Sequence, residues 1–426
     1  MNGMLTLAES KKLSEKPTRI EIRKFGPLKE VTFEVGANAL DIIYGPPGSG
    51  KSYLLKFIYS MIKLPLVKIL KYKVNEELDL KRDFLEGLYE VFASDAYTLF
   101  KEMDVRLESD CIGLTIANER ISYELRKTCA ELPAKAKNEL APPFLSPKNV
   151  RGVYYGPWEF WSPNKSLPSW YGTLVSMLFP SLSTLRVYKG DGEELVTIVP
   201  PVSLFGPAGR ASVISLYTQL GLTHFKALRP PLPLLYVPYL EAFEGFMERK
   251  FTQGFKRIGK DAKQLLQELL LGGEVKYVSN ELKYRKDGIE VLLFNAAAGV
   301  LENGTLAMAL IELVENMGDD VSAIAFVEEP EAQLHPRLQR IIVRFLSSLA
   351  ETSVSFLITS HSAIVATEAI ILKLRKNLNA KIYHLEDGYM KEIDVNEYLS
   401  IGIPSLVVEG EEQFAELDDA LTKVEK

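Results

Sequence analysis

One eight-residue stretch constrains this chain more than any other. Residues 45–52 read Gly-Pro-Pro-Gly-Ser-Gly-Lys-Ser and match the phosphate-binding pattern G-x-x-x-x-G-K-[ST] at every fixed position. The apolar run Leu40–Tyr44 precedes the stretch, and apolar residues at helical spacing follow it up to Met61. These flanks favour a strand, a P-loop and a helix over an ordinary glycine-rich turn. The sequence therefore predicts a site for nucleotide phosphates.

The residue types of this loop suit phosphate and Mg²⁺. Its glycines let backbone N–H groups close around the phosphates, Lys51 is expected to reach the β- and γ-phosphates, and Ser52 is expected to give its hydroxyl to Mg²⁺. We expect the base to be adenine, and so the cofactors to be ATP and Mg²⁺, although the loop does not read the base. The candidate binding residues are Gly45, Pro46, Pro47, Gly48, Ser49, Gly50, Lys51, Ser52 and Tyr53.

Two carboxylates follow a second buried strand. Glu328 and Glu329 come directly after the apolar run Ala323–Val327, at the strand end where ligands of open α/β sheets bind. We expect Glu328 to hold Mg²⁺ through water and Glu329 to activate the attacking water; a solvated acidic loop is the alternative. Lys51 and Glu328 are 277 positions apart, which argues against ring-forming AAA+ machines and small GTPases.

Three further polar residues are candidates for the site or its surroundings. His361 follows the predicted strand Ser355–Thr359 and is one of only four histidines. At a strand end it can bond a γ-phosphate and position water, whereas a structural histidine is the alternative. Arg210 follows another predicted strand as a candidate nucleotide contact, again with a structural role as the alternative. His335 is expected to be a loop or interface contact.

The pattern of strands and helices predicts the fold class and its divisions. Strands alternate with helices around the motifs, which predicts an α/β fold with a mainly parallel sheet, and the hairpin at 19–35 predicts an antiparallel β subdomain. We expect the following divisions: 1–17, polar and helix-like; 18–62, with the P-loop; 63–200, an insertion of mixed helices and hairpins; 201–237, a return to the core; 238–273, a helical arm or lid; 274–408, with the acidic motif and His361; and 409–426, a tail.

Composition excludes several classes of protein. The 426 residues are 47% hydrophobic and 25% charged, which excludes disorder over most of the length. The net charge of −6 means that any contact with nucleic acid must be local. With only Cys111 and Cys129, neither a disulfide framework nor a thiolate zinc site is expected. No apolar run reaches the roughly 20 residues that cross a bilayer, so we expect a cytoplasmic protein without a membrane partner.

Taken together, these elements resemble a known family. Phe25–Leu28 (Phe-Gly-Pro-Leu), the P-loop, Glu328–Pro336 (Glu-Glu-Pro-Glu-Ala-Gln-Leu-His-Pro) and Thr359–Ser362 (Thr-Ser-His-Ser) look like the ABC-type P-loop ATPases of the OLD, SMC and RecF kind. The proline-containing acidic motif is most similar to the OLD-like group. The resemblance covers roughly residues 18–60 and 200–400. It implies a P-loop NTPase fold with the ABC-type sheet and a Mg²⁺-dependent ATPase activity.

The resemblance also implies how two copies would combine. In that family two copies pair head to tail, and each P-loop faces the signature segment of the other, which implies a homodimer or a subunit of a larger complex. By position the signature is Asn295–Gly299, with Ala298 and Gly299 near the partner's nucleotide. A serine usually opens this segment, whereas Ala296 carries no hydroxyl, although backbone N–H groups can still donate. We therefore expect weaker closure and slow turnover.

The resemblance leaves the downstream role open. One hypothesis is an ATPase in nucleic-acid maintenance or anti-phage defence, and the other is a nucleotide-gated switch or scaffold that recruits a protein effector, which the alanine-rich signature favours. The motor of a membrane importer is disfavoured by the same signature and by the long insertion. Leu406–Glu411 resembles the opening strand of a Toprim nuclease domain, but the later paired aspartates are absent, so we expect no nuclease.

Two local features could contact partners. The segment Arg249–Lys263 carries six basic residues and one acidic residue, which suits either a nucleic-acid backbone or a solvated helix face. The aromatic run Tyr154–Tyr171 could stack on bases, or form core or a protein interface.

Overall fold

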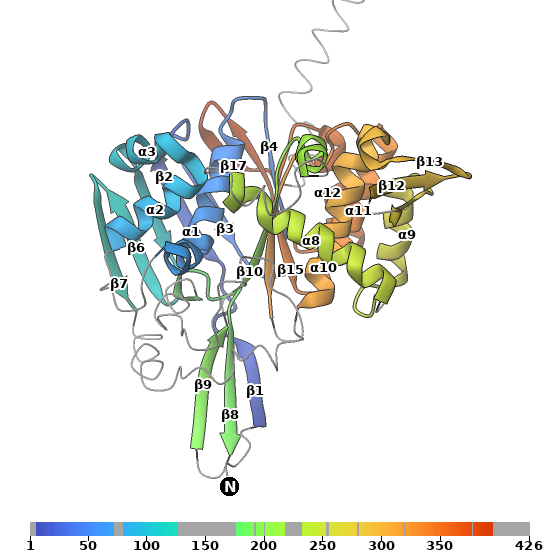
Figure 1. Ribbon diagram of the computed structural model, residues 1–426. Coiled ribbons are helices and arrows are strands. Elements are labelled where there is room, and N and C mark those ends of the chain that lie inside the picture. The colour runs from blue at the N-terminus through green and yellow to red at the C-terminus, as the bar shows by residue number, and fades with distance from the viewer. Residues whose placement is uncertain are drawn as a thin grey trace, which may run out of the picture.

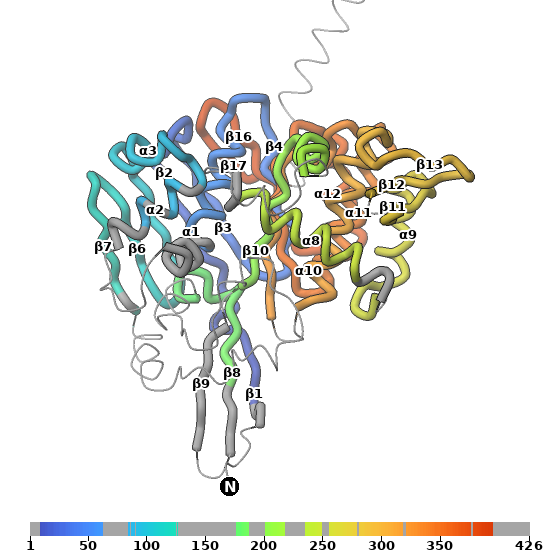
Figure 2. The backbone as a smooth tube through the Cα atoms, in the orientation of Figure 1, coloured from blue at the N-terminus to red at the C-terminus, as the bar shows by residue number. Residues whose placement is uncertain are grey.

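The computed structural model describes most of the chain. The described residues are 6–71, 80–126, 176–190, 193–199, 201–217, 232–252, 255–278, 281–317, 321–376 and 378–394 (in colour in Figure 1; Figure 2 shows the same backbone as a tube). Three features singled out in the sequence lie outside them: Cys129, the aromatic run 154–171 and the segment 406–411.

A six-stranded sheet forms the centre of the molecule (Figure 1). Each neighbouring pair of strands is parallel except the last, β16 with β17, so the predicted mainly parallel sheet is confirmed. In spatial order the strands are β10 (Val202–Gly206), β14 (Ala323–Glu328), β15 (Val354–Ser360), β4 (Leu40–Tyr44), β16 (Ile382–Glu386) and β17 (Tyr389–Glu392).

The central strands are buried on both faces, because helices cover each side. In β14, Ala325 and Val327 face one core cluster while Ile324 and Phe326 face the other, as the two-residue period of a strand requires. The helices of the first side are α8 (Leu232–Thr252), α9 (Lys260–Leu269), α10 (Thr305–Asn316), α11 (Pro336–Ala350) and α12 (Ala363–Lys376). Those of the second side are α1 (Lys51–Lys71), α2 (Leu80–Phe92) and α3 (Ala96–Glu102).

The predicted antiparallel subdomain is larger than the first hairpin. Its five strands are, in spatial order, β3 (Val31–Val35), β2 (Thr18–Lys24), β5 (Asp104–Glu108), β6 (Ile112–Ala117) and β7 (Arg120–Leu125). Residues 104–125 therefore complete the sheet that the N-terminal hairpin begins, and the expected division at residue 63 runs through one unit. Cys111, between β5 and β6, is buried and disulfide-bonded, which the cysteine count did not predict.

Two smaller sheets extend from the body (Figure 1). One is made of β1 (Thr6–Lys12), β8 (Thr184–Gly190) and β9 (Glu193–Val199). The expectation of a helix-like N-terminal segment is therefore wrong for Thr6–Lys12, which pairs with β8. The other is made of β11 (Glu274–Val278), β12 (Glu281–Lys286) and β13 (Ile289–Leu292), with a turn at Asp287 between the last two.

The predicted helical arm is two helices separated by a non-helical stretch. The backbone N–H groups of Lys256, Arg257 and Ile258 donate to the Glu315 carboxylate of α10 at 2.7–3.0 Å, which ties the break to the body. α9 then buries Ala262, Leu266 and Leu269 in the core, so this part of the segment is packed rather than projecting. Among the described residues, no helix is both long and apolar enough to span a membrane.

Candidate functional site

Three adjacent strands bring the predicted motifs to one edge of the sheet. β15 lies between β14 and β4, with Glu328 opposite Thr359 and Ser360 opposite Tyr44. Because all three strands are parallel, the P-loop after β4, the acidic motif after β14 and His361 after β15 emerge side by side. The sequence motifs that are 277 positions apart thus form one site.

The P-loop has the backbone that its glycines predict. Gly48 and Gly50 adopt φ of 78° and 102°, a region that glycine enters without the steric cost that a Cβ imposes. A Cβ on Gly50 would lie 2.7 Å from Leu28 Cδ2, so the Phe-Gly-Pro-Leu turn packs directly on the loop. Helix α1 begins at Lys51, which directs its first N–H groups toward the loop.

The Lys51 ammonium group bonds carbonyl oxygens of its own loop. Its Nζ donates to the carbonyl oxygens of Gly45 and Pro46 at 2.8 and 2.7 Å. Burial lowers the pKa of Lys51 to about 8, against the opposing effect of Glu329 and Glu331 nearby. The lysine is therefore held where phosphate oxygens would replace the carbonyl oxygens.

His361 joins this lysine to the candidate base. Lys51 Nζ lies 3.3 Å from His361 Nδ1, and His361 Nε2 lies 3.2 Å from Glu329 Oε1. A protonated lysine can only donate, so Nδ1 accepts and Nε2 carries the proton that it donates to Glu329. The three side chains that were chosen from separate motifs are thus in direct contact.

Glu328 has one carboxylate oxygen available for a cation. The side chain is buried; its Oε2 accepts from the Ala208 backbone N–H at 3.0 Å, while its Oε1 has no hydrogen-bond partner and lies 4.0 Å from Lys56 Nζ. A buried carboxylate oxygen without a hydrogen bond is costly unless a cation compensates it. Among the described residues, no group of three or more acidic, histidine or cysteine side chains is arranged to hold a metal ion by itself. A Mg²⁺ ion would therefore depend on Ser52, Glu328, phosphate and water, as is usual for this ion.

Glu331 is a site residue that the sequence reasoning missed. Its Oε1 accepts from the Ser360 hydroxyl at 2.8 Å and from the His361 backbone N–H at 2.7 Å. Burial raises the pKa of Glu331, while these two hydrogen bonds oppose that rise. The sequence did contain a signal for this role, namely a third acidic residue in the Glu-Glu-Pro-Glu motif. In the structure this residue faces the end of β15. Glu331 fixes the backbone that carries His361.

Arg210 is buried beneath the acidic motif. Its side chain is fully buried, and its guanidinium donates to backbone carbonyls on three segments, including those of Glu302 and Glu328. Arg210 therefore has the structural role that was named as the alternative to a nucleotide contact, and it lies beneath the acidic motif. The sequence does not predict this burial, because an arginine after a strand can be either exposed or buried.

The expected signature segment lies at the surface beside the acidic motif. Asn295, Ala297 and Ala298 are exposed, and a Cβ on Gly299 would lie 3.1 Å from Leu334 Cδ2 in the loop that follows Glu329. A π-helical turn at Val300–Gly304 follows and leads into α10. The segment is accessible to a second copy.

The remaining expected residues have local roles. The ring of Tyr53 packs against Phe25 and Phe92, with centroids 6.4 and 5.6 Å away. His335 is exposed and caps α11 by accepting the Arg337 N–H at Nδ1. The side chains of Lys256, Lys260 and Lys263 are exposed.

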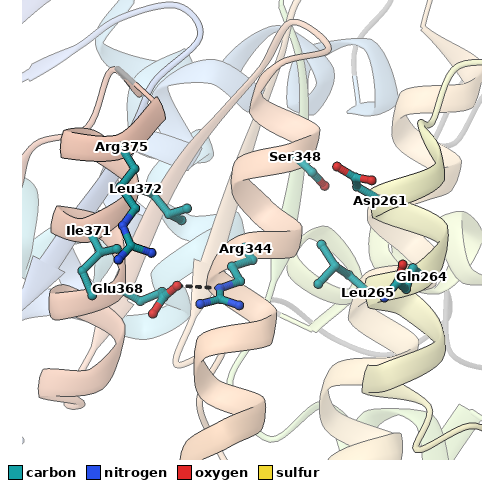
Figure 3. Close-up of a pocket in the computed structure, with 9 residues that line it drawn as sticks. All are labelled: Asp261, Gln264, Leu265, Arg344, Ser348, Glu368, Ile371, Leu372 and Arg375. Carbon is teal, nitrogen blue, oxygen red and sulfur yellow. Dashed lines mark hydrogen bonds and ion pairs between the residues drawn. The ribbon is translucent and has the colours of Figure 1, made fainter.

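A pocket of about 340 Å³ lies between α9, α11 and α12 (Figure 3). Its central charges neutralise one another, since Arg344 donates to the Glu368 carboxylate at 2.6 Å. No residue expected to bind the nucleotide lines it.

One protein-family model matches part of the chain. Residues 224–366, which include the signature segment and the acidic motif, match the family described as "AAA domain, putative AbiEii toxin, Type IV TA system". No curated protein sequence matches the chain.

Among solved structures, an Smc head bound to the C-winged helix domain of ScpA is 13% identical at a TM-score of 0.40, covering 89% of this chain and 97% of that one. A second Smc head, bound to the C-terminal domain of ScpA derived from Pyrococcus furiosus, is 11% identical at 0.42, covering 91% and 98%. An ATP-binding cassette of an ABC transporter in its ADP conformation is 14% identical at 0.37, covering 93% and 98%. Because these scores are below 0.5, the fold assignment rests on the strand order and the positions of the motifs.

Proposed function

Because the chain has the fold of an ABC-type P-loop ATPase, we propose that it binds Mg²⁺-ATP at Gly45–Ser52 and hydrolyses it in the cytoplasm. The observation that carries the proposal is the direct chain of contacts from Lys51 through His361 to Glu329. It supports a phosphate-binding lysine, a water-positioning histidine and a general base within one site.

Each residue has a separate task in this proposal. Lys51 leaves the loop carbonyls for the phosphates, and Glu329 takes a proton from the attacking water, while His361 orients that water and the γ-phosphate. Ser52 and Glu328 would hold Mg²⁺, which supplies charge neutralisation on the phosphates when bound. The buried Glu328 Oε1, which has no hydrogen-bond partner, supports this assignment.

A second copy of the chain completes the site in this proposal. The exposed signature Asn295–Gly299 supports a head-to-tail homodimer, in which Ala298 and Gly299 would offer backbone N–H groups to the partner's γ-phosphate. Since Ala296 gives no hydroxyl, we expect slow turnover. The alternative is a switch that recruits an effector upon ATP binding. It rests on the same missing hydroxyl at Ala296. The matched family's description names a toxin–antitoxin system, which supports a role in anti-phage defence.

Two variants test the proposed chemistry. Glu329→Gln should keep ATP binding and lose most hydrolysis, because an amide cannot take a proton, whereas Lys51→Ala should lose the nucleotide. His361→Ala should slow turnover, and His335→Ala is its matched control on an exposed histidine. Steady-state hydrolysis and equilibrium binding are the measurements. Hydrolysis at the parental rate in Glu329→Gln would remove the assigned base.

Nucleic acid is the proposed partner of the basic segment. Lys256 and Lys260 are exposed, which supports weak, sequence-independent binding to phosphates. On duplex DNA each contacted phosphate should contribute about −0.9 to the logarithmic salt slope. Filter binding at several salt concentrations should therefore give a steep slope for the parent and a flatter one for a triple Lys256→Glu, Arg257→Glu, Lys260→Glu variant. Equal binding by both proteins would favour the effector switch.

A further inference from the structure

Arg210 is bonded to the loop that carries the candidate base. Its guanidinium donates to the carbonyl oxygens of Pro207, Glu302 and Glu328 at 2.7 Å each, and to that of Glu329 at 3.2 Å. The side chain is fully buried, where a cation is stable only if its donors are satisfied. These carbonyl oxygens satisfy them, so the contacts are a fixed part of the fold.

Glu329 needs such support, because its backbone is in an unfavourable conformation. Its φ is 45°, in the left-handed region where a Cβ is strained. Its N–H donates to the Thr359 carbonyl at 3.0 Å, and its carbonyl accepts from the Ala332 N–H and from Arg210. This conformation determines where the Glu329 carboxylate points, and Arg210 holds it from the buried side.

The same arginine bonds the turn that follows the signature segment. Besides the Glu302 carbonyl, it lies 3.5 Å from Asn303 Oδ1 and 3.6 Å from the Glu302 carboxylate. Asn303 in turn donates to the Ala332 carbonyl at 3.0 Å. The π-helical turn Val300–Gly304 and the loop Glu328–Ala332 are therefore joined at two points, with Arg210 at the centre.

We propose that Arg210 is a positioning residue for ATP hydrolysis, which fixes Glu329 in its left-handed conformation and ties it to the turn behind the signature. The inference rests on the proposed function. Arg210 touches no reacting atom; it acts through Glu329.

Arg210→Lys in the full chain is the direct test, because an ammonium group cannot reach four carbonyls as a planar guanidinium does. ATP affinity should be unchanged, since the P-loop contacts are intact, while kcat should fall roughly 10- to 100-fold, as for other supports of a catalytic group. In a Glu329→Gln background the same change should have no further effect on residual hydrolysis. Arg337→Lys, on an exposed arginine, is the matched control and should leave kcat unchanged.

The proposal would be overturned if the fold-losses in kcat of Arg210→Lys and Glu329→Gln multiplied in the double variant. It would also be overturned if Arg210→Lys alone left kcat unchanged. If Arg210→Lys does not fold, Asn303→Ala carries the same test with a smaller fall in kcat. Hydrogen exchange separates this proposal from the proposed function. If the parent hydrolyses no ATP, the proposed function fails. Positioning is still supported if, in Arg210→Lys, backbone amides exchange faster at 328–333 and at an unchanged rate at 45–52. Unchanged amide exchange in both segments overturns it.

Discussion

Lys51 meets two opposite demands at the residue scale. It must be charged to attract phosphates, yet its burial disfavours the charged form. Backbone carbonyls and His361 stabilise the charged form. In the function proposed above, phosphate oxygens would take the place of these acceptors.

We expect ATP affinity to fall as the pH rises above about 8. Burial lowers the pKa of Lys51 to about 8, so the free protein loses this charge above that pH, while bound phosphates favour the charged form. Binding must then take up a proton, and affinity should fall by up to roughly tenfold per pH unit. Equilibrium binding between pH 7 and 9.5 measures it. Lys51→Arg, which stays charged, should flatten the profile; a flat parental profile would contradict the prediction.

Glu331 should matter for turnover and not for nucleotide affinity. Glu331→Ala removes the acceptor of the Ser360 hydroxyl and the His361 N–H, so kcat should fall roughly 10- to 100-fold. Glu331→Gln should retain most activity, because its amide oxygen can accept both bonds. Glu351→Gln, at the exposed far end of α11, is the control. Equal loss in both Glu331 variants would point to a role for the charge itself.

At the scale of elements, β4 contains an unusual residue for a buried parallel strand. Asp41 lies among four apolar neighbours, and its Oδ1 accepts from the Lys381 N–H of the chain entering β16 at 3.1 Å. Burial raises the pKa of Asp41 to about 7, although Lys381 opposes the rise. The folded protein therefore keeps the Asp41 carboxyl protonated up to about pH 7, whereas the unfolded chain releases this proton near the ordinary aspartate pKa of 3.8.

This shift predicts a pH-dependent contribution to stability. Because the folded pKa is above the unfolded one, the stabilisation is complete below about pH 4 and is lost as the pH rises through about 7. Asp41→Asn should remove the dependence and raise the free energy of unfolding at pH 8 by up to about 4 kcal/mol. Denaturant unfolding at pH 5 and 8 tests it, with Asp104→Asn in β5 as control. A variant that is no more stable than the parent at pH 8 would count against a buried carboxylate.

At the scale of the whole molecule, the proposed dimer makes self-association depend on the nucleotide. The surface signature lies against the acidic loop of its own chain, and a second copy would supply the facing P-loop. We expect ATP to promote self-association, most strongly in Glu329→Gln, where hydrolysis does not reset the complex. Light scattering with and without ATP measures it, and Lys51→Ala is the control that should not respond. A mass independent of nucleotide at all concentrations would contradict ATP-driven pairing.

The sequence by itself determined the local chemistry. The P-loop, the acidic motif and His361 each follow an apolar strand, and chain direction alone places such residues at one edge of a parallel sheet. Strands β14 and β15 begin and end within one residue of the predicted bounds, because both are short, continuous apolar runs.

Only the tertiary structure decided which polar groups are buried and which distant segments pair. The sequence did not predict the roles of Arg210 and Glu331, because their burial depends on remote neighbours. Arg210 contacts a residue more than 90 positions away, and Glu331 contacts one nearly 30 positions away. The N-terminal strand was missed because its partner, β8, is far along the chain, and a polar sequence without period gives no local signal. Hydrogen bonding between remote strands is a property of the folded chain, and no short window of residues contains it.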